Sequence, residues 1–432
     1  MERQESHELR VEVSASDTWL PKGSIYEKIQ GSSNILRFDE VCESKDAGIN
    51  YQRVGVGWQS RTRSKLAERI LYEGKQQDTR DYQYLKGEDI DRFSICPAAL
   101  RWLRHNYAEL VYEGEVVSVN HEWAQKPLKI LTRQTGDRII AALDSARHYT
   151  GRSLHSTVVT QGEYSYLYIL AILNSTFISY YYNVLAREKG RALAQVKLKN
   201  VRQLPIRRIT FTTPPEERER LVGEGITEAT EWIESTEGTS VDSVTFSAFS
   251  ASVFGRWLDG RLSAEPEQSD VVHDLLAHLA EQMIEMHKQK QAEVRSFLDW
   301  LTGYTGLPVD DWALKTNLRR YYEHDWAEMK RVLKRNQRKL PQVNLDVDAY
   351  RNEPATKIRA AWETSMEALR PLLARIAATD RLIDLIVYRL YGLTEEEVAV
   401  VEGVGPRNAR NSANDTKRTG HFRAFRGLSC LS

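Results

Sequence analysis

The spacing of apolar residues changes about halfway along the chain. In the second half, apolar residues recur three or four positions apart over 270–302 and again over 356–391, which is the period of one helix face. The first of these stretches carries Val272, Leu275, Leu276, Leu279, Met283 and Met286, and then Val294, Phe297, Leu298 and Leu301. The pattern predicts long amphipathic helices, which more often pack on each other than on a partner.

Several helix ends are marked by their own signals. Thr212-Thr213-Pro214-Pro215, followed by three glutamates, predicts a helix that begins at the prolines. Thr379 is expected to cap the helix over 379–391, and Gly392 to end it. Thr394 and Glu397 have the spacing of a capping box for one further turn. The Ser/Thr/Gly-rich stretch 235–252 reads as a linker or irregular loop.

The first half shows shorter periods. Residues 33–93 predict short strands and loops, and 98–107 a short basic helix. Residues 129–134 and 139–143 predict two strands joined by a turn at Thr135-Gly136-Asp137, and 155–159 predicts another strand. The apolar run 167–185 predicts one buried helix, and 196–206 a strand or loop that ends at Pro205.

These patterns predict an α+β protein, in which a mixed α/β domain is followed by a mainly α-helical C-terminal region. We expect four parts: a connector at 1–30, the mixed domain at 31–209, the helical region at 210–403 and a basic disordered tail at 404–432. There is no internal repeat.

Composition bears on compartment and membrane. Three cysteines lie far apart, which fits a reducing cytoplasm, and the polar N-terminal segment has no secretory signal. The one candidate for a membrane span, 164–186, contains two asparagines and six tyrosines. Those polar groups need partners, so we expect a buried helix and no membrane association.

Charge is sorted along the chain, although the formal net charge is zero. Residues 126–208 hold 14 Lys+Arg against 4 Asp+Glu, whereas 210–403 hold 23 basic and 34 acidic residues. A basic segment beside an ordered apolar scaffold indicates a polyanion partner, most often nucleic acid. The basic stretch 315–339 fits either a second DNA contact or a solvated helix.

Motifs for catalysis and metal binding are missing. The chain has no phosphate-binding loop, no His-Glu-x-x-His, no Gly-rich S-adenosylmethionine loop and no Asn-Pro-Pro-Tyr-type motif. Gly55-x-Gly57 is too short for a dinucleotide fingerprint. The histidines are scattered and read as surface or packing residues, and the pairs Asp89/Asp91 and Asp310/Asp311 as loop or cap residues. We therefore predict no catalytic residue, no metal and no cofactor in this chain.

An ordered set of motifs resembles a known family. ILTRQTGDRIIAALD, LHSTVV, LYILAILNSTFISYYYNVL and QVKLKNVRQLPI follow one another between residues 130 and 206. Together they resemble the TaqI-like C-terminal specificity domain, the target-recognition part of adenine-specific DNA methyltransferases and fused restriction–modification enzymes. Upstream GINYQRVGVGW and YLKGEDIDRF and the C-terminal TDRLIDLIVYRLYGLTEEEVAVVEG extend the resemblance over about 30–403.

The resemblance implies a function in two parts. This chain would bind double-stranded DNA in the cytoplasm and direct N6-adenine methylation, in a restriction–modification or phage-defence system. The catalytic half would be a separate methyltransferase that carries S-adenosylmethionine. The candidate DNA contacts are Arg53, Gln59, Arg61, Arg63, Arg133, Gln134, Arg138, Arg187, Lys189, Arg191, Lys197, Lys199 and Arg202.

Roles within the set follow from chemistry. Arginine can grip guanine edges and glutamine adenine edges, whereas lysines more often meet phosphates. We expect Lys86 to support the domain, and Asn174 and Ser175 to tie the buried helix to neighbouring strands. Three alternatives stay open: a helical protein-interaction scaffold, a truncated inactive methyltransferase remnant, and an enzyme with an unrecognised site.

Overall fold

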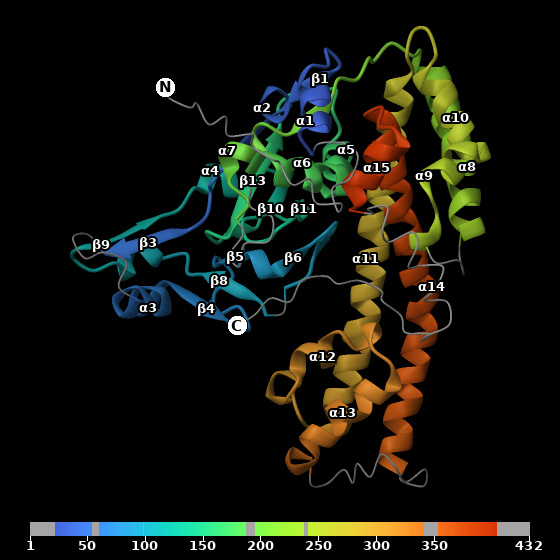
Figure 1. Cartoon of the computed structure of the whole chain (residues 1–432). Helices are drawn as coiled ribbons and strands as arrows, with labels where there is room; N and C mark the ends of the chain where they lie inside the picture. Colours follow the sequence, from blue (N-terminus) through green and yellow to red (C-terminus); the bar gives the residue numbers. More distant parts are fainter. Residues whose placement is uncertain are drawn as a thin grey trace, which may run out of the picture.

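The computed structural model describes residues 22–53, 60–97, 99–186, 195–236, 241–340 and 353–403. A mixed α/β part lies beside a bundle of long helices, which confirms the predicted α+β class (Figure 1). The predicted tail at 404–432 and most of the predicted connector at 1–30 lie outside the described residues. From the connector the structure describes α1 (Lys22–Gln30), which is helical.

A four-stranded antiparallel sheet forms the centre of the α/β part. Its order is β11 (Ala141–Asp144), β10 (Lys129–Arg133), β13 (Leu154–Val159) and β2 (Cys42–Lys45). The predicted hairpin and third strand are thus confirmed. β10 is buried on both faces, because Ile130 packs into the main core and Leu131 into a smaller cluster with Leu85 and Leu154.

Helices α5 (Tyr166–Asn174) and α6 (Thr176–Ala186) follow the sheet, and α5 packs on β10 and β11. The prediction of one helix over 167–185 is wrong, because the chain bends by 65° at Ser175. Ser175 is extended, and the Asn174 side chain donates to the Ala141 carbonyl and accepts from its amide, each at 3.0 Å. These bonds confirm the expected tie to a strand for Asn174, whereas the Ser175 hydroxyl bonds to Ile172 and Ile178 within the two helices.

No described helix is by itself both long and apolar enough to cross a membrane. α5 and α6 meet that test only as a pair, and the pair is bent. Every residue from Tyr168 to Asn174 is buried in the core, as the sequence predicted for this run.

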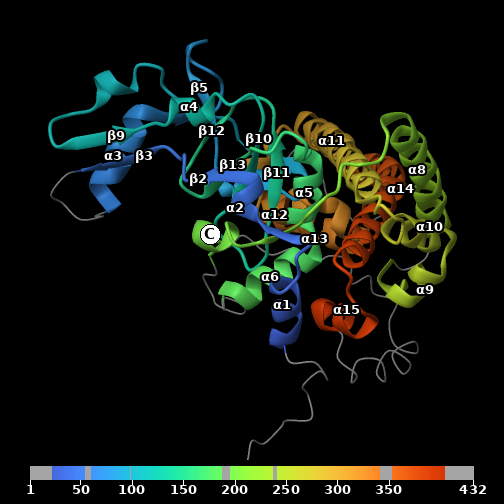
Figure 2. The same ribbon diagram turned by 90° about the horizontal axis from the view of Figure 1, so that it is seen from above.

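A second layer of short strands lies below the central sheet. Its order is β12 (Tyr149–Thr150), β5 (Tyr82–Leu85), β8 (Arg101–Leu103) and β4 (Leu71–Glu73). A ribbon of β3 (Asn50–Arg53) and β9 (Glu115–Ser118) projects from it beside α3 (Ser60–Ile70) (Figures 1 and 2). Small elements complete the part: α4 (His121–Ala124), β6 (Ile90–Asp91) and β7 (Ser94–Ile95).

The predicted short basic helix at 98–107 is wrong, because its described centre is strand β8. The Arg101 side chain is buried and forms ion pairs with Asp89, Glu73 and Glu88. Arg101 is therefore an internal anchor between β8 and the turn before β6.

The segment 196–206 is neither one strand nor a loop. It forms α7 (Leu198–Val201) and then β14 (Pro205–Arg207), which pairs with β1 (Ile35–Arg37), and α2 (Phe38–Val41) follows β1. α8 (Pro215–Thr236) follows β14 and begins at the prolines as predicted.

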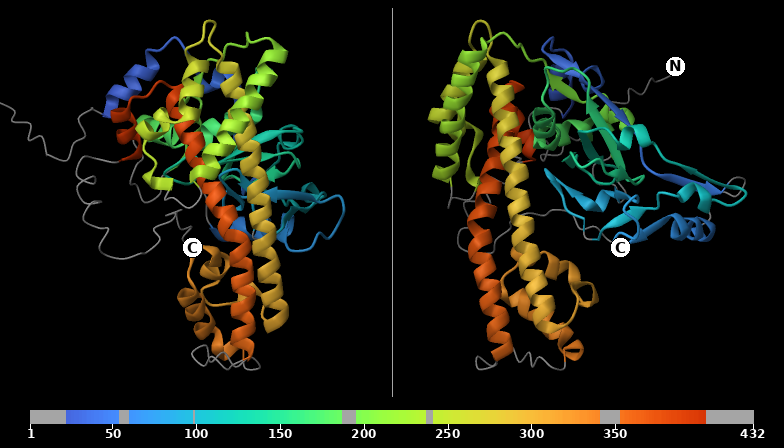
Figure 3. Two further views of the ribbon diagram at one scale, coloured as in Figure 1. Left: turned by 90° about the vertical axis from the view of Figure 1, so that its right-hand side faces the viewer. Right: turned by 180° about the vertical axis from the view of Figure 1, so that it is seen from behind.

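The helical part is built on two long helices, α11 (Ser269–Thr305) and α14 (Glu353–Leu390), which pack along each other (Figure 3). α8, α9 (Phe246–Ala251) and α10 (Val253–Leu262) cover their side away from the sheet (Figure 2). At the far end, α12 (Lys315–Arg319) and α13 (Trp326–Asn336) close a separate small core.

Two predictions for this part are wrong and two are confirmed. The stretch 235–252 contains α9, whose Phe246 and Phe249 are buried, and Thr379 lies inside α14 instead of capping a helix. Gly392 does end α14 with a left-handed φ of 63°. The Thr394/Glu397 capping box does start α15 (Glu395–Glu402).

One hydrophobic core joins the two parts. It contains residues of the central sheet, α5 and α6 together with α8, α11, α14 and α15. α1 and α15 both contribute apolar residues to it, and the Lys28 ammonium on α1 donates to the Glu397 carboxylate at 2.7 Å and to the Gly392 carbonyl at 2.8 Å. The first and last described helices therefore complete the same core.

Candidate nucleic-acid interface

One end of the central sheet gathers segments that are far apart in the sequence. The Val196 amide donates to the Gln134 carbonyl at 2.8 Å, and the Gln134 amide donates to the Ser153 carbonyl at 2.9 Å. An isolated bridge pairs Thr135 with Gln195. The turn after β10, the start of β13 and the segment before α7 are thereby fixed together.

Five of the predicted DNA contacts lie at this end, and we call them the sheet-end surface: Arg133, Gln134, Lys197, Lys199 and Arg202. The two lysines and Arg202 are exposed on and around α7, and the Arg202 guanidinium donates to the Ser44 carbonyl at 2.9 Å. A Cβ atom added to Gly87 would lie 3.4 Å from Cγ of Arg133, so the Arg133 stem lies over that glycine.

Gln134 is held by two residues that the sequence did not single out. Its side-chain nitrogen donates to the Asp46 carboxylate at 3.2 Å and lies 3.3 Å from Nδ1 of His155. His155 is 3% exposed, and its Nδ1 is hydrogen-bonded to the same Asp46 oxygen. Its Nε2 donates to the Val196 carbonyl at 2.8 Å. No sequence signal links Asp46 to His155, because the two are 109 positions apart.

The charge on Asp46 is favoured by this arrangement. The hydrogen bond from His155 is the main cause that lowers the pKa of Asp46, and the positive charges of His155, Arg202 and Arg152 act in the same direction. The carboxylate is therefore ionised at neutral pH. Its side chain is 62% exposed and lies beside cationic residues.

Arg138 lies apart from the sheet-end surface. It is largely enclosed where the sheet meets α14, close to Arg92, Asp380 and Asp384. Burial and the Arg92 charge lower the pKa of Arg138. Arg92 itself forms a two-pronged ion pair with Asp380 at 2.5 and 2.6 Å and donates to the Asn174 carbonyl. This group joins the two parts of the protein, and a DNA contact by Arg138 stays a prediction.

The remaining candidates are placed only by backbone or lie outside the description. Arg53 is the last residue of β3 and pairs with Glu115 on β9, while Arg61 and Arg63 lie on α3. Gln59, Arg187, Lys189 and Arg191 lie outside the described residues. The ribbon that carries Arg53 projects away from the body of the molecule (Figure 2).

Other polar residues have structural roles. The Lys86 amide donates to the Asp89 carboxylate at 2.7 Å, which fixes the turn before β6. This geometry agrees with the prediction that Lys86 supports the domain. His273 accepts from the Ser165 amide within an aromatic cluster. Among the described residues no group of three or more His, Cys, Asp or Glu side chains could hold a metal ion.

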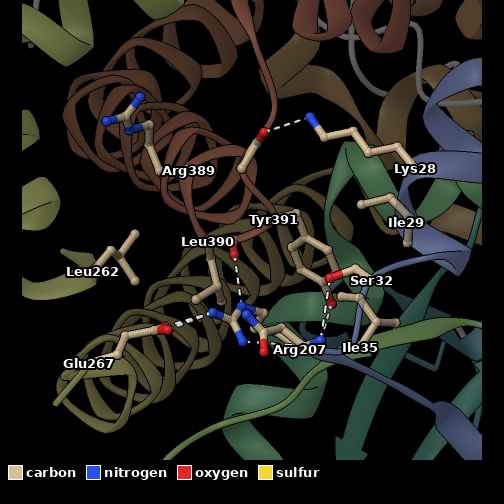
Figure 4. A pocket seen from close by; sticks show the side chains of 12 residues that line it. Lys28, Ile29, Ser32, Ile35, Arg207, Leu262, Glu267, Arg389, Leu390 and Tyr391 are labelled. Atoms are coloured by element: carbon tan, nitrogen blue, oxygen red, sulfur yellow. Dashed lines mark hydrogen bonds and ion pairs between the residues drawn. The ribbon is translucent and has the colours of Figure 1, made fainter. Parts of the chain in front are cut away.

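A pocket of about 340 Å³ lies between α1, β14, α10 and the end of α14 (Figure 4). Its cations are already engaged: Arg207 pairs with Glu267 at 2.7 Å and donates to the Leu390 carbonyl, and Lys28 donates to the Gly392 carbonyl. Arg389 pairs with Asp259. The pocket is thus a joint between the two parts rather than a charged ligand site.

Comparison with known families gives two matches. Residues 82–206 match the family described as the TaqI-like C-terminal specificity domain. Residues 269–387, which span α11 to α14, match a domain of unknown function (DUF8810). No curated protein matches the chain. The first match begins at β5 and ends in β14, so it includes the whole sheet-end surface.

Proposed function

Because residues 82–206 form a TaqI-like C-terminal specificity domain, we propose that this chain is the DNA-reading part of a two-part adenine methyltransferase. It binds duplex DNA in the cytoplasm and presents a target site to a separate N6-adenine methyltransferase, which holds S-adenosylmethionine. The system serves restriction–modification or phage defence. No cofactor of its own is required by this chain.

The observation that supports the proposal most directly is the convergence at the sheet end. Two exposed lysines and an exposed arginine surround a partly buried glutamine whose amide is fixed by hydrogen bonds. Cations that meet phosphates set the position of a protein on DNA, and a fixed amide can read a base edge. Residues suited to both kinds of contact lie within one family-matched segment.

Binding of the purified chain to a duplex tests the DNA part of the proposal. We expect the affinity to fall steeply with salt, because each lysine or arginine on a phosphate releases counterions. The double reversal Lys197→Glu/Lys199→Glu should weaken binding about uniformly over all sequences and make the salt dependence less steep by about two ion contacts. The control reverses Lys288 on α11, an exposed lysine that is not part of the sheet-end surface.

The two-part mechanism has its own measurement. The chain is combined with the methyltransferase that co-purifies with it, and N6-methyladenine is mapped in DNA. Site-specific methylation that requires both proteins supports the proposal. Methyl transfer by this chain alone would favour an enzyme with an unrecognised site. Unchanged methylation after the Lys197/Lys199 reversal would favour the helical scaffold.

A further inference from the structure

Asp46, Gln134 and His155 form a hydrogen-bonded cluster at the sheet-end surface. Phosphate binding alone does not require such a cluster. Asp46 is an exposed carboxylate next to Arg152 and Arg202, and an anion at that place repels phosphates. Its presence on a basic surface therefore needs a reason of another kind. The hydrogen bonds supply one, because both polar neighbours of Asp46 donate to the same oxygen.

The hydrogen bonds of His155 fix the orientation of its ring. Nε2 faces the Val196 carbonyl and Nδ1 faces the Asp46 carboxylate, and both of these are acceptors. The ring is therefore held in one orientation between Asp46 and the segment before α7. The ring is buried, and its position is set by the backbone of the segment before α7.

The same contacts fix which way the Gln134 amide points. The amide nitrogen must face Asp46, because a carboxylate accepts and does not donate. The amide oxygen of Gln134 then points away from Asp46. One of the two N–H groups of the amide donates to Asp46, and the other does not. An oxygen acceptor beside an N–H donor is the pair that matches N6 and N7 of adenine in the major groove.

We propose that Gln134 reads an adenine and that Asp46 and His155 are positioning residues for its amide. The inference rests on the proposed function, because it names the residue that discriminates on the DNA-binding surface. Without Asp46 the Gln134 amide can rotate by half a turn, which exchanges its donor and its acceptor. The affinity for DNA as a whole remains, whereas the preference for adenine at that position is lost.

The test uses the purified full chain and a duplex library with randomised central positions. We compare wild type, Gln134→Ala, Asp46→Ala and the double variant. Asp46 is largely exposed, so its replacement keeps the fold, which a thermal melt verifies. Glu43→Ala is the matched control, because Glu43 is an exposed carboxylate on β2, the strand that ends one residue before Asp46, and its removal changes the charge equally.

The expected result is a loss of adenine preference on the order of tenfold at one base pair, the same pair in both single variants. The double variant loses no more, since both changes act through one contact. Asp46→Ala still binds bulk duplex at low salt at least as tightly as wild type, and Glu43→Ala keeps the preference.

Three results would overturn the inference. A normal adenine preference in Asp46→Ala, with a lost preference in Gln134→Ala, removes the positioning role. A wild-type chain that binds duplex without any adenine preference removes the reading role of Gln134 and leaves the proposed function in place. A wild-type chain that binds no duplex at low salt removes the proposed function itself.

Discussion

Asp384 shows how a single buried carboxylate couples this protein to pH. Its side chain accepts from the Thr176 amide at 2.7 Å and from the Thr176 hydroxyl at 2.6 Å, where α14 meets the start of α6. Burial, reinforced by the nearby Asp380 charge, raises the pKa of Asp384 to about 6. The folded protein therefore holds a proton on Asp384 at pH values where the unfolded chain has released it.

The sign of the resulting effect follows from linkage. Between about pH 4 and pH 6 the folded state binds more protons at this group, so its contribution to stability falls as the pH rises. Asp384→Asn removes this titration. We subtract the free energy of unfolding of wild type from that of the variant. This difference should be about 3 kcal/mol more positive at pH 7 than at pH 4.

Urea titrations at both pH values measure that difference. Asp39→Asn is a suitable control, because Asp39 is a partly exposed carboxylate paired with Arg37 on the surface. A gap between wild type and Asp384→Asn that stays constant with pH would contradict a raised pKa at this site.

At the scale of elements, the sequence predicted strands and helix ends well where a local signal marks them. It did not predict where a helix is interrupted. The hairpin β10–β11, strand β13, the start of α8 and the capping box of α15 follow from local signals. The bend at Ser175 does not, because the residues bonded on either side of it, Ala141 to Asn174 and Asp384 to Thr176, lie 33 and 208 positions away. The predicted helix over 98–107 failed for the same reason, since the carboxylate partners of Arg101 come from other elements.

The candidate site divides in the same way. Arg133, Gln134, Lys197, Lys199 and Arg202 were found as a basic cluster in one segment, and the fold brings them to one end of the sheet. Asp46 and His155 were missed because each looks ordinary in its own stretch. Only the antiparallel pairing of β2 with β13 brings the two side chains together.

The turn between α9 and α10 offers a test at the scale of one element. A Cβ atom at Gly255 would lie 2.2 Å from the Phe249 carbonyl oxygen, so the first turn of α10 has no room for a side chain. Gly255→Ala should destabilise the protein by about 1–3 kcal/mol through overpacking. Chemical denaturation gives the value.

The control is in the same helix. Gly260 is exposed, and a Cβ atom there would have no neighbour within 4 Å. Gly260→Ala should raise the free energy of unfolding by about 0.5–1 kcal/mol, because alanine loses less backbone entropy in a helix. Equal effects of the two variants would argue against the tight contact at Gly255.

At the scale of the whole molecule, the two long helices contribute to two separate hydrophobic cores. The main core includes the sheet, whereas Leu318, Tyr321 and Leu333 belong to the separate core between the far ends of α11 and α14. Leu318 is fully buried. Leu318→Ala should cost about 2–5 kcal/mol in the far core.

Hydrogen exchange can locate that loss. We expect faster exchange in α12, α13 and the adjoining ends of α11 and α14, with unchanged protection in β10 and β13 and unchanged DNA binding. Leu131→Ala is the counterpart, because Leu131 is fully buried in the sheet and its loss should speed exchange there. Equal loosening of the sheet by Leu318→Ala would mean that the two cores unfold together.

The contact between Lys28 and Glu397 joins residues 369 positions apart. A ribosome adds about 5–20 residues per second, so α1 waits for tens of seconds before α15 can reach it. During that interval Ile25 and Ile29, which end up buried, have only part of their final surroundings. The duration of synthesis therefore sets how long the apolar face of α1 is open to chaperones and to other unfinished chains.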